Sequence, residues 1–127
     1  MSARVGRDEA PAGPIVQGFA AGGFSVSGIV YPSLMLTPDS VERWNSPPSV
    51  DALTIADLGP LLALDPQPEF LLLGTGPALR FPPRVLARAL EERGVGLEVM
   101  DSRAAARVWG LLRGEERWIA AALMPLG

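Results

Sequence analysis

The side chains that could do chemistry in this chain are carboxylates, hydroxyls and arginines. Its 127 residues include no Cys, no His and no Lys, and all 11 basic residues are Arg. Ordinary zinc sites, catalytic triads, P-loops and Schiff-base enzymes each need one of the missing types. We therefore predict no metal, no cofactor and no enzymatic activity, and an enzyme restricted to Asp, Glu, Arg and hydroxyl chemistry is the least favoured interpretation.

The strongest candidate site lies where two predicted strands end. A glycine-rich loop follows the apolar run 70–73, and the next strand ends in an acid and a hydroxyl. Ligands of open α/β sheets bind at the carboxyl ends of the strands. Arginine and a capped helix start both suit an anion. The sequence thus predicts a site for a small anionic ligand formed by Gly74, Thr75, Gly76, Arg80, Asp101 and Ser102.

A purely structural role for the same residues is the alternative. Glycines relieve the chain where it leaves a crowded sheet, and Arg80 could pair with an acid such as Asp101. Dinucleotide binding is disfavoured, because Leu79 occupies the third glycine position and Pro82-Pro83 delays the helix.

The elements that would position this site fall into two halves. Gly and Pro punctuate short β-rich runs in residues 14–44, with turn signals at Ser27-Gly28 and Pro38-Asp39-Ser40. These runs predict locally paired antiparallel strands at Ile15–Phe19, Phe24–Val26, Ile29–Tyr31, Leu34–Thr37 and Val41–Trp44. A loop and a short or broken helix follow; Thr54 is its predicted N-cap and Gly59-Pro60 interrupts it.

Strands and helices alternate in the second half. Apolar runs and helical periodicity predict the order strand Phe70–Leu73, helix Arg84–Arg93, strand Leu97–Met100, helix from Asp101 or Ser102 to Leu112, and strand Trp118–Met124. Two strand–helix–strand units imply parallel pairs, so the class is α/β with an antiparallel β appendage. The predicted inward stripes are Val85, Leu86, Ala89 and Leu90, then Ala104, Ala105, Val108, Leu111 and Leu112. We expect Trp109 and Trp118 to anchor a core or an interface.

Charge and hydropathy restrict the partners. The net charge of −3 argues against general nucleic-acid binding. The longest apolar stretch, 118–126, is far shorter than the roughly 20 residues of a membrane span. Residues 1–13 lack the apolar core of a signal peptide, so we expect a disordered tail, a single domain over 14–127 and a cytoplasmic location.

Several segments, taken in order, resemble one family. They are Gly18-Phe19, Gly22-Gly23-Phe24, Leu71-Leu72-Leu73-Gly74-Thr75-Gly76, Arg80-Phe81-Pro82, Val99-Met100-Asp101 and Ala120-Ala121-Ala122-Leu123-Met124-Pro125. Over residues 14–126 the chain resembles the Mth938-like domain family, of largely unassigned function, whose mitochondrial members include a respiratory complex I assembly factor. The resemblance implies three layers: a central mixed sheet, helices on both sides and a small antiparallel β-element.

The resemblance also implies a function. Where the family often has Arg-Thr-Tyr-Asn, this chain has Arg107-Val108-Trp109-Gly110, which lacks the hydroxyls and the amide and favours packing or a partner. We expect a non-enzymatic interaction or assembly protein that aids complex I biogenesis, with respiratory-complex subunits or assembly factors as partners. The alternative is a domain that binds a small anionic ligand at the site above. Self-association and peripheral membrane contact are left open.

Overall fold

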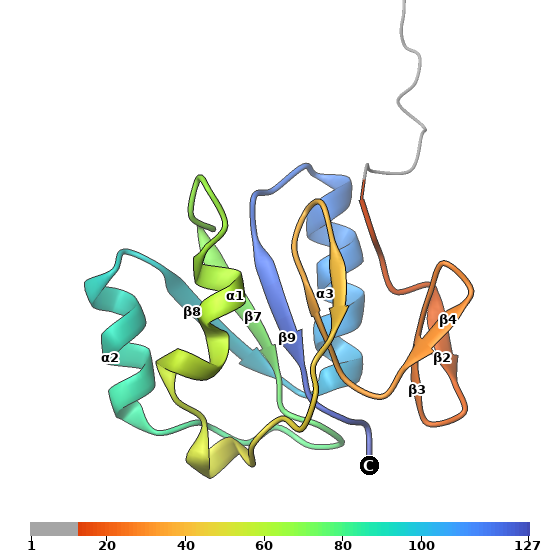
Figure 1. Ribbon diagram of the computed structural model, residues 1–127, viewed down its shortest axis with the longest axis horizontal. Coiled ribbons are helices and arrows are strands. Elements are labelled where there is room, and N and C mark those ends of the chain that lie inside the picture. Colours follow the sequence, from red (N-terminus) through yellow and green to blue (C-terminus); the bar gives the residue numbers. More distant parts are fainter. Residues whose placement is uncertain (1–12) are drawn as a thin grey trace, which may run out of the picture.

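A five-stranded mixed sheet forms the centre of the molecule (Figure 1). The computed structural model describes residues 13–127. The strands of this sheet, in spatial order, are β6 (Val41–Arg43), β5 (Leu34–Leu36), β9 (Ala120–Leu123), β7 (Phe70–Gly74) and β8 (Gly96–Met100). Residues 1–12 of the predicted tail lie outside the described residues.

A separate three-stranded antiparallel sheet precedes the central one. It consists of β2 (Gly18–Ala20), β3 (Gly23–Val26) and β4 (Ile29–Tyr31). The turn between β3 and β4 has Ser27 at φ 51° and Gly28 at φ 82°. Positive φ at both central residues is what a tight hairpin with a right-handed twist needs. The predicted hairpin at Ser27-Gly28 is therefore confirmed.

Only β2–β4 of the first half form the predicted antiparallel β appendage, because β5 and β6 belong to the central sheet. They pair with each other as predicted, but β5 also runs antiparallel to β9, with Leu34 opposite Leu123. All three residues of β5 are buried. A strand that is apolar on both faces needs cover on both, and here only the central sheet lies between two layers.

The second half folds as two strand–helix–strand units, as predicted. β7 pairs in parallel with both β8 and β9. The two connecting helices are α2 (Arg84–Glu92) and α3 (Ser102–Gly114). The predicted broken helix is also present, as the 3-10 turn η2 (Ile55–Leu58) followed by α1 (Gly59–Leu62) and preceded by η1 (Val50–Ala52). The Thr54 amide donates to Asp57 Oδ2 at 2.8 Å, which confirms Thr54 as the N-cap.

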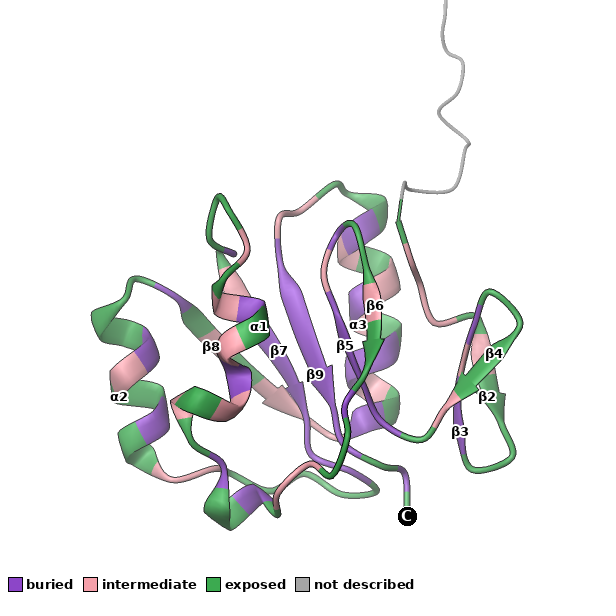
Figure 2. Cartoon of the chain, viewed as in Figure 1, coloured by how far each residue is buried: buried purple, intermediate pink, exposed green. Residues whose placement is uncertain are grey.

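Apolar side chains alternate between the two faces of the sheet and form two cores (Figure 2). On β7, Leu71 and Leu73 pack with α1 and α2, whereas Leu72 packs with α3. The β2–β4 sheet adds Phe24 and Val26 to the α3 side. This arrangement confirms the predicted three-layer α/β fold. Within residues 13–127, no helix is long and apolar enough to cross a membrane.

The predicted helix stripes differ from the buried faces of the two helices. On α2, Leu86 and Leu90 are buried as expected, but Val85 is 68% exposed. On α3 the predicted stripe was displaced around the helix, because the buried residues are Ser102, Ala105, Ala106, Trp109 and Arg113, while Leu111 is 65% exposed. A helix flat on a sheet buries a narrow stripe, so residues at its margin stay in water even when they are apolar. Trp109 is fully buried, and its Nε1 donates to the Pro14 carbonyl at 2.9 Å, so it is the core anchor that we expected.

Candidate functional site

Ser102 joins the carboxyl ends of the central strands. Its fully buried Oγ accepts a hydrogen bond from the Gly76 amide and donates one to the Met124 carbonyl, both at 2.8 Å. Gly76 follows β7 and Met124 follows β9, while Ser102 begins α3 after β8. One hydroxyl therefore links three chain segments at a shared edge and uses both its donor and its acceptor capacity within the protein.

Thr75 organises the loop that leaves β7. Its Oγ1 donates to the Ala78 carbonyl at 2.7 Å and accepts from the Arg80 amide at 3.1 Å. The Thr75 amide donates to the Met100 carbonyl at 2.9 Å and so extends the β7–β8 ladder by one bond. With a side chain only 4% exposed, Thr75 is a buried polar residue whose groups are paired locally.

Gly74 lets the end of β7 lie close to Ser102 and Leu123. A Cβ at this position would come within 2.8 Å of Ser102 Cα and 2.9 Å of Leu123 Cδ2. Gly76 is required for another reason, since its φ of +97° lies in the region that residues with a side chain rarely adopt. The glycine-rich segment thus lets α3 start directly against the end of β7.

Asp101 caps α3. Its Oδ1 accepts from the Ala104 amide at 2.9 Å, which satisfies one of the free N–H groups of the first helical turn. The sequence allowed either Asp101 or Ser102 as the start of this helix, and the structure shows that Asp101 is its N-cap.

Arg80 does not pair with Asp101. Its Nη2 lies 3.0 Å from Asp51 Oδ2, and both side chains are more than half exposed. The residues after Thr75 form a surface loop, and this loop carries the guanidinium outward towards η1. The structural alternative expected Arg80 to pair with an acid, and it does, but the acid is Asp51 and not the suggested Asp101. The observed pair is of the weak surface kind.

The structure therefore gathers five of the six predicted residues and turns the side chain of the sixth away. The five residues that meet at the carboxyl edge of the sheet are Gly74, Thr75, Gly76, Asp101 and Ser102. The hydroxyls of Thr75 and Ser102 and the carboxylate of Asp101 already form hydrogen bonds within the chain. Binding of an anion at this cluster stays a prediction.

A second charged pair lies at the opposite end of the central strands. Arg117 Nη2 is 2.8 Å from Glu69 Oε1, and the Glu69 amide donates to the Trp118 carbonyl. The hydrogen bond from Arg117 holds the pKa of Glu69 below its ordinary value of 4.5. Glu69 in turn raises the pKa of Arg117. The pair bridges the segments that enter β7 and β9.

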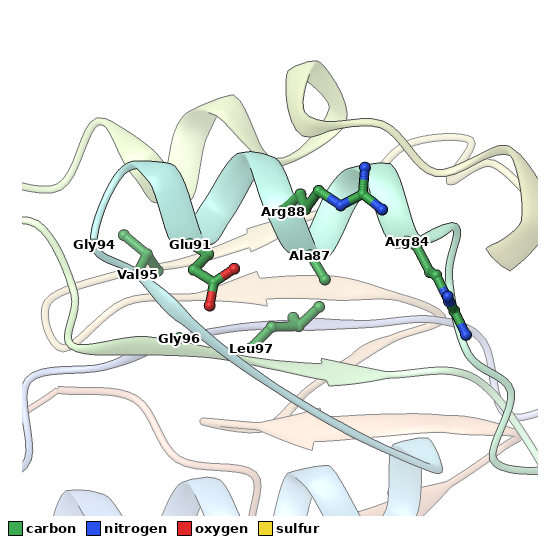
Figure 3. A pocket seen from close by; sticks show the side chains of 8 residues that line it. All are labelled: Arg84, Ala87, Arg88, Glu91, Gly94, Val95, Gly96 and Leu97. Carbon is green, nitrogen blue, oxygen red and sulfur yellow. The ribbon is translucent and has the colours of Figure 1, made fainter.

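A groove between α2 and β8 is a surface feature that the sequence analysis missed. Its volume is about 520 Å³. We call it the α2–β8 groove (Figure 3), and it is lined by Arg84, Ala87, Arg88, Glu91, Gly94, Val95, Gly96 and Leu97. A sequence pattern shows which residues are helical, but not how far a helix stands from the strand beside it.

Exposed apolar side chains cluster at the amino end of α2. Leu79, Phe81 and Val85 are 51%, 72% and 68% exposed and lie within seven consecutive residues. Large apolar groups concentrated in this way commonly mark interaction surfaces. The available sequence signal was Leu79 and Phe81, two large apolar residues in the loop before Pro82-Pro83 and outside the predicted helix stripe.

Comparison with known proteins gives consistent results. The family described as "Protein of unknown function (DUF498/DUF598)" matches residues 16–124. A Danio rerio protein named NADH dehydrogenase [ubiquinone] 1 alpha subcomplex assembly factor 3 is 33% identical over 98% of this chain and 71% of its own length.

Two solved structures share the fold. A crystal structure of a Bordetella parapertussis protein has a TM-score of 0.80 at 30% identity, covering 91% of this chain and 98% of that one. The solution structure of a Bordetella pertussis protein, described as a Mth938-like domain, has a TM-score of 0.78 at 25% identity, covering 98% and 93%. The chain therefore belongs to the DUF498/DUF598 family of Mth938-like domains, as its ordered motifs predicted.

Proposed function

We propose that this protein takes part in the assembly of respiratory complex I by binding a complex I subunit or another assembly factor, without catalysing a reaction. The similarity to the Danio rerio assembly factor carries this proposal, because it extends over nearly the whole chain. A cytoplasmic location stays a prediction.

The exposed apolar surface supports a binding role. Phe81 and Val85 are more than two-thirds exposed, and Arg84 and Arg88 lie next to them on the groove wall. Aromatic residues and Arg are enriched at protein interfaces, whereas exposed apolar groups in water contribute nothing to folding. A partner that covers these side chains would gain the free energy of their burial.

The available chemistry supports binding rather than turnover. The chain has no Cys, His or Lys, and the groups at the carboxyl edge of the sheet are Thr, Ser, Asp and Arg. None of these has an ordinary pKa near neutrality, and general acid–base catalysis is most effective with groups that do.

Purification from native cells tests the proposal. A tagged copy expressed at the native level should recover a complex I subunit or assembly factor in near-stoichiometric amount, with the tag alone as control. If no complex I protein is enriched over that control, the proposal is wrong.

The ligand alternative makes a different prediction. If the predicted site binds a small anion, a panel of metabolic anions should include one that raises the melting temperature, since a ligand of the native state stabilises it. Arg80→Ala should abolish that shift. An unchanged shift in Arg80→Ala, or no shift with any anion, counts against the ligand site.

A further inference from the structure

The outer edge of β8 has unpaired main-chain groups. Among residues 13–127, β8 is the last strand of the central sheet and pairs only with β7. The Gly96 amide donates to the Glu69 carbonyl, and the Met100 carbonyl accepts from the Thr75 amide. In a parallel pair, alternate residues of a strand bond to the neighbour. Gly96, Glu98 and Met100 thus face β7, and the N–H and C=O groups of Leu97 and Val99 point away from it.

The other edge of the sheet is less suited to pairing. β6 has three residues, two of which are the charged Glu42 and Arg43, and short charged strands are a common protection of an edge. β8 has five residues and one charge, Glu98. The side chains of Leu97 and Val99 pack on the α2 side of the sheet, whereas that of Met100 packs on the α3 side.

The α2–β8 groove lies beside this free edge. Figure 3 shows Ala87, Glu91 and Leu97 pointing into the space between helix and strand, with Arg84 at the end remote from Gly94 and Gly96. Within residues 13–127 neither Arg84 nor Arg88 has a carboxylate close enough to form an ion pair. The groove therefore has Ala87 and Leu97 on its floor, the Glu91 carboxylate nearer Gly94, and Arg84 at the opposite end.

Arg84 is in an unfavourable place for the helix itself. Arg84 is the first residue of α2, and no acid occupies the first turn. A positive charge there opposes the helix dipole, and Arg88 four residues on adds like-charge repulsion. Residues that conflict with local stability in this way are commonly found at functional positions.

We propose that β8 accepts an extended segment of the partner protein as an additional strand of the sheet, with an acidic side chain of that segment bound by Arg84 and Arg88. This inference rests on the proposed function, because it names how the partner is held. Main-chain bonds to Leu97 and Val99 supply affinity, and the charges at the groove end supply selectivity.

The surroundings of β8 define the sequence pattern of that segment. Side chains on the α2 side meet Leu97 and Val99 and should be apolar, with an acid at the Arg84 end. The side chain on the other side meets Glu98 and should be basic. Successive side chains of a strand point to opposite faces of the sheet. Read towards Arg84, the expected sequence of the segment is therefore apolar, basic, apolar, any residue, acidic.

Two synthetic peptides serve as probes, Thr-Val-Lys-Val-Thr-Asp for parallel addition and its reverse for antiparallel addition. Hydrogen exchange of the full-length protein is followed by NMR. At saturation, one peptide should slow exchange of the Leu97 and Val99 amides about tenfold or more, with little change at Glu98, whose amide already bonds to β7. A peptide with Lys and Asp exchanged is the matched control and should bind more weakly.

Variants test the charges and the edge separately. Arg84→Glu should weaken peptide binding about fivefold or more, while its melting temperature stays at or above that of the native protein. Arg107→Glu makes the same charge change on the exposed face of α3 and should leave affinity unchanged. Val99→Pro removes one outward N–H without touching the β7 ladder and should abolish protection at Leu97.

Three results would overturn strand addition. They are the absence of binding by both peptides up to ~1 mM, equal binding by native protein and Arg84→Glu, and protection of the Leu97 and Val99 amides without peptide. Protection that rises with protein concentration would assign the edge to a second copy of this chain. If native purification recovers a complex I protein equally with Arg84→Glu, the proposed function stands and strand addition fails; if native protein recovers none, the proposed function itself fails.

Discussion

Ser102 and Thr75 are polar side chains that the interior tolerates because backbone groups pair with them. Ser102 Oγ bonds to the Gly76 amide and the Met124 carbonyl, and Thr75 Oγ1 bonds to the Ala78 carbonyl and the Arg80 amide. The sequence could predict that these residues meet, because all follow strands that end at the same edge. It could not predict that neighbouring backbone groups would occupy their hydroxyls, since that depends on the exact path of the loop.

Ser102→Ala should be the most costly single hydroxyl deletion in the cluster. It leaves the Gly76 amide and the Met124 carbonyl buried without this partner, and each such loss costs about 1–3 kcal/mol. Denaturant unfolding should therefore show a free energy of unfolding lower by at least ~1 kcal/mol. Ser40→Ala, which removes an exposed hydroxyl paired with Thr37, is the control. A loss for Ser102→Ala no larger than for the control would contradict this role.

The helices and strands show which contacts the sequence can and cannot specify. The Ile29–Tyr31 strand, the Thr54 cap and both strand–helix–strand units follow from local pattern and turn chemistry. The pairing of β5 with β9 joins residues nearly ninety positions apart, such as Leu34 and Leu123, and no local pattern encodes it. Val85 and Leu111 were misassigned because an apolar side chain at a stripe's margin looks the same in sequence whether or not a neighbour covers it.

Two glycines in this region should respond oppositely to the same substitution. Gly74→Ala places a Cβ 2.8 Å from Ser102 Cα and should lower the free energy of unfolding by about 1–3 kcal/mol. Gly110→Ala, inside α3 with open space around it, should raise that free energy by about 0.5–1 kcal/mol, because alanine favours the helix. Thermal and denaturant unfolding measure both. A neutral Gly74→Ala would show that β7 and α3 are not in tight contact.

The Glu69–Arg117 pair should make stability depend on pH in the acidic range. The pKa of Glu69 is lower in the folded state than its ordinary value of 4.5. The contribution of the pair is therefore fully present above pH 4.5 and is lost as the pH falls through the folded-state pKa. Glu69→Gln should melt lower than the native protein at neutral pH, and the difference should shrink towards about pH 3. Glu42→Gln, which removes an exposed carboxylate on β6, is the control and should show no comparable trend. If the melting temperature of Glu69→Gln differed from that of the native protein by the same amount at every pH, the result would argue against the pair.

At the scale of the whole molecule, an uncovered strand edge, a groove and a cluster of exposed apolar side chains lie together around α2. The fold and the family follow from the sequence, because ordered motifs and element order are encoded locally. The proposed interaction surface does not, because the exposure of Phe81 and Val85 and the groove beside Leu97 depend on where α2 lies relative to β8.

Deletion of the gene tests the central claim most directly. If this protein assists complex I assembly, native gel electrophoresis of the deletion strain should show a reduced amount of assembled complex I, with its subunits retained in smaller subcomplexes, and a plasmid copy should restore the native amount. An unchanged amount of assembled complex I in the deletion strain would contradict the account.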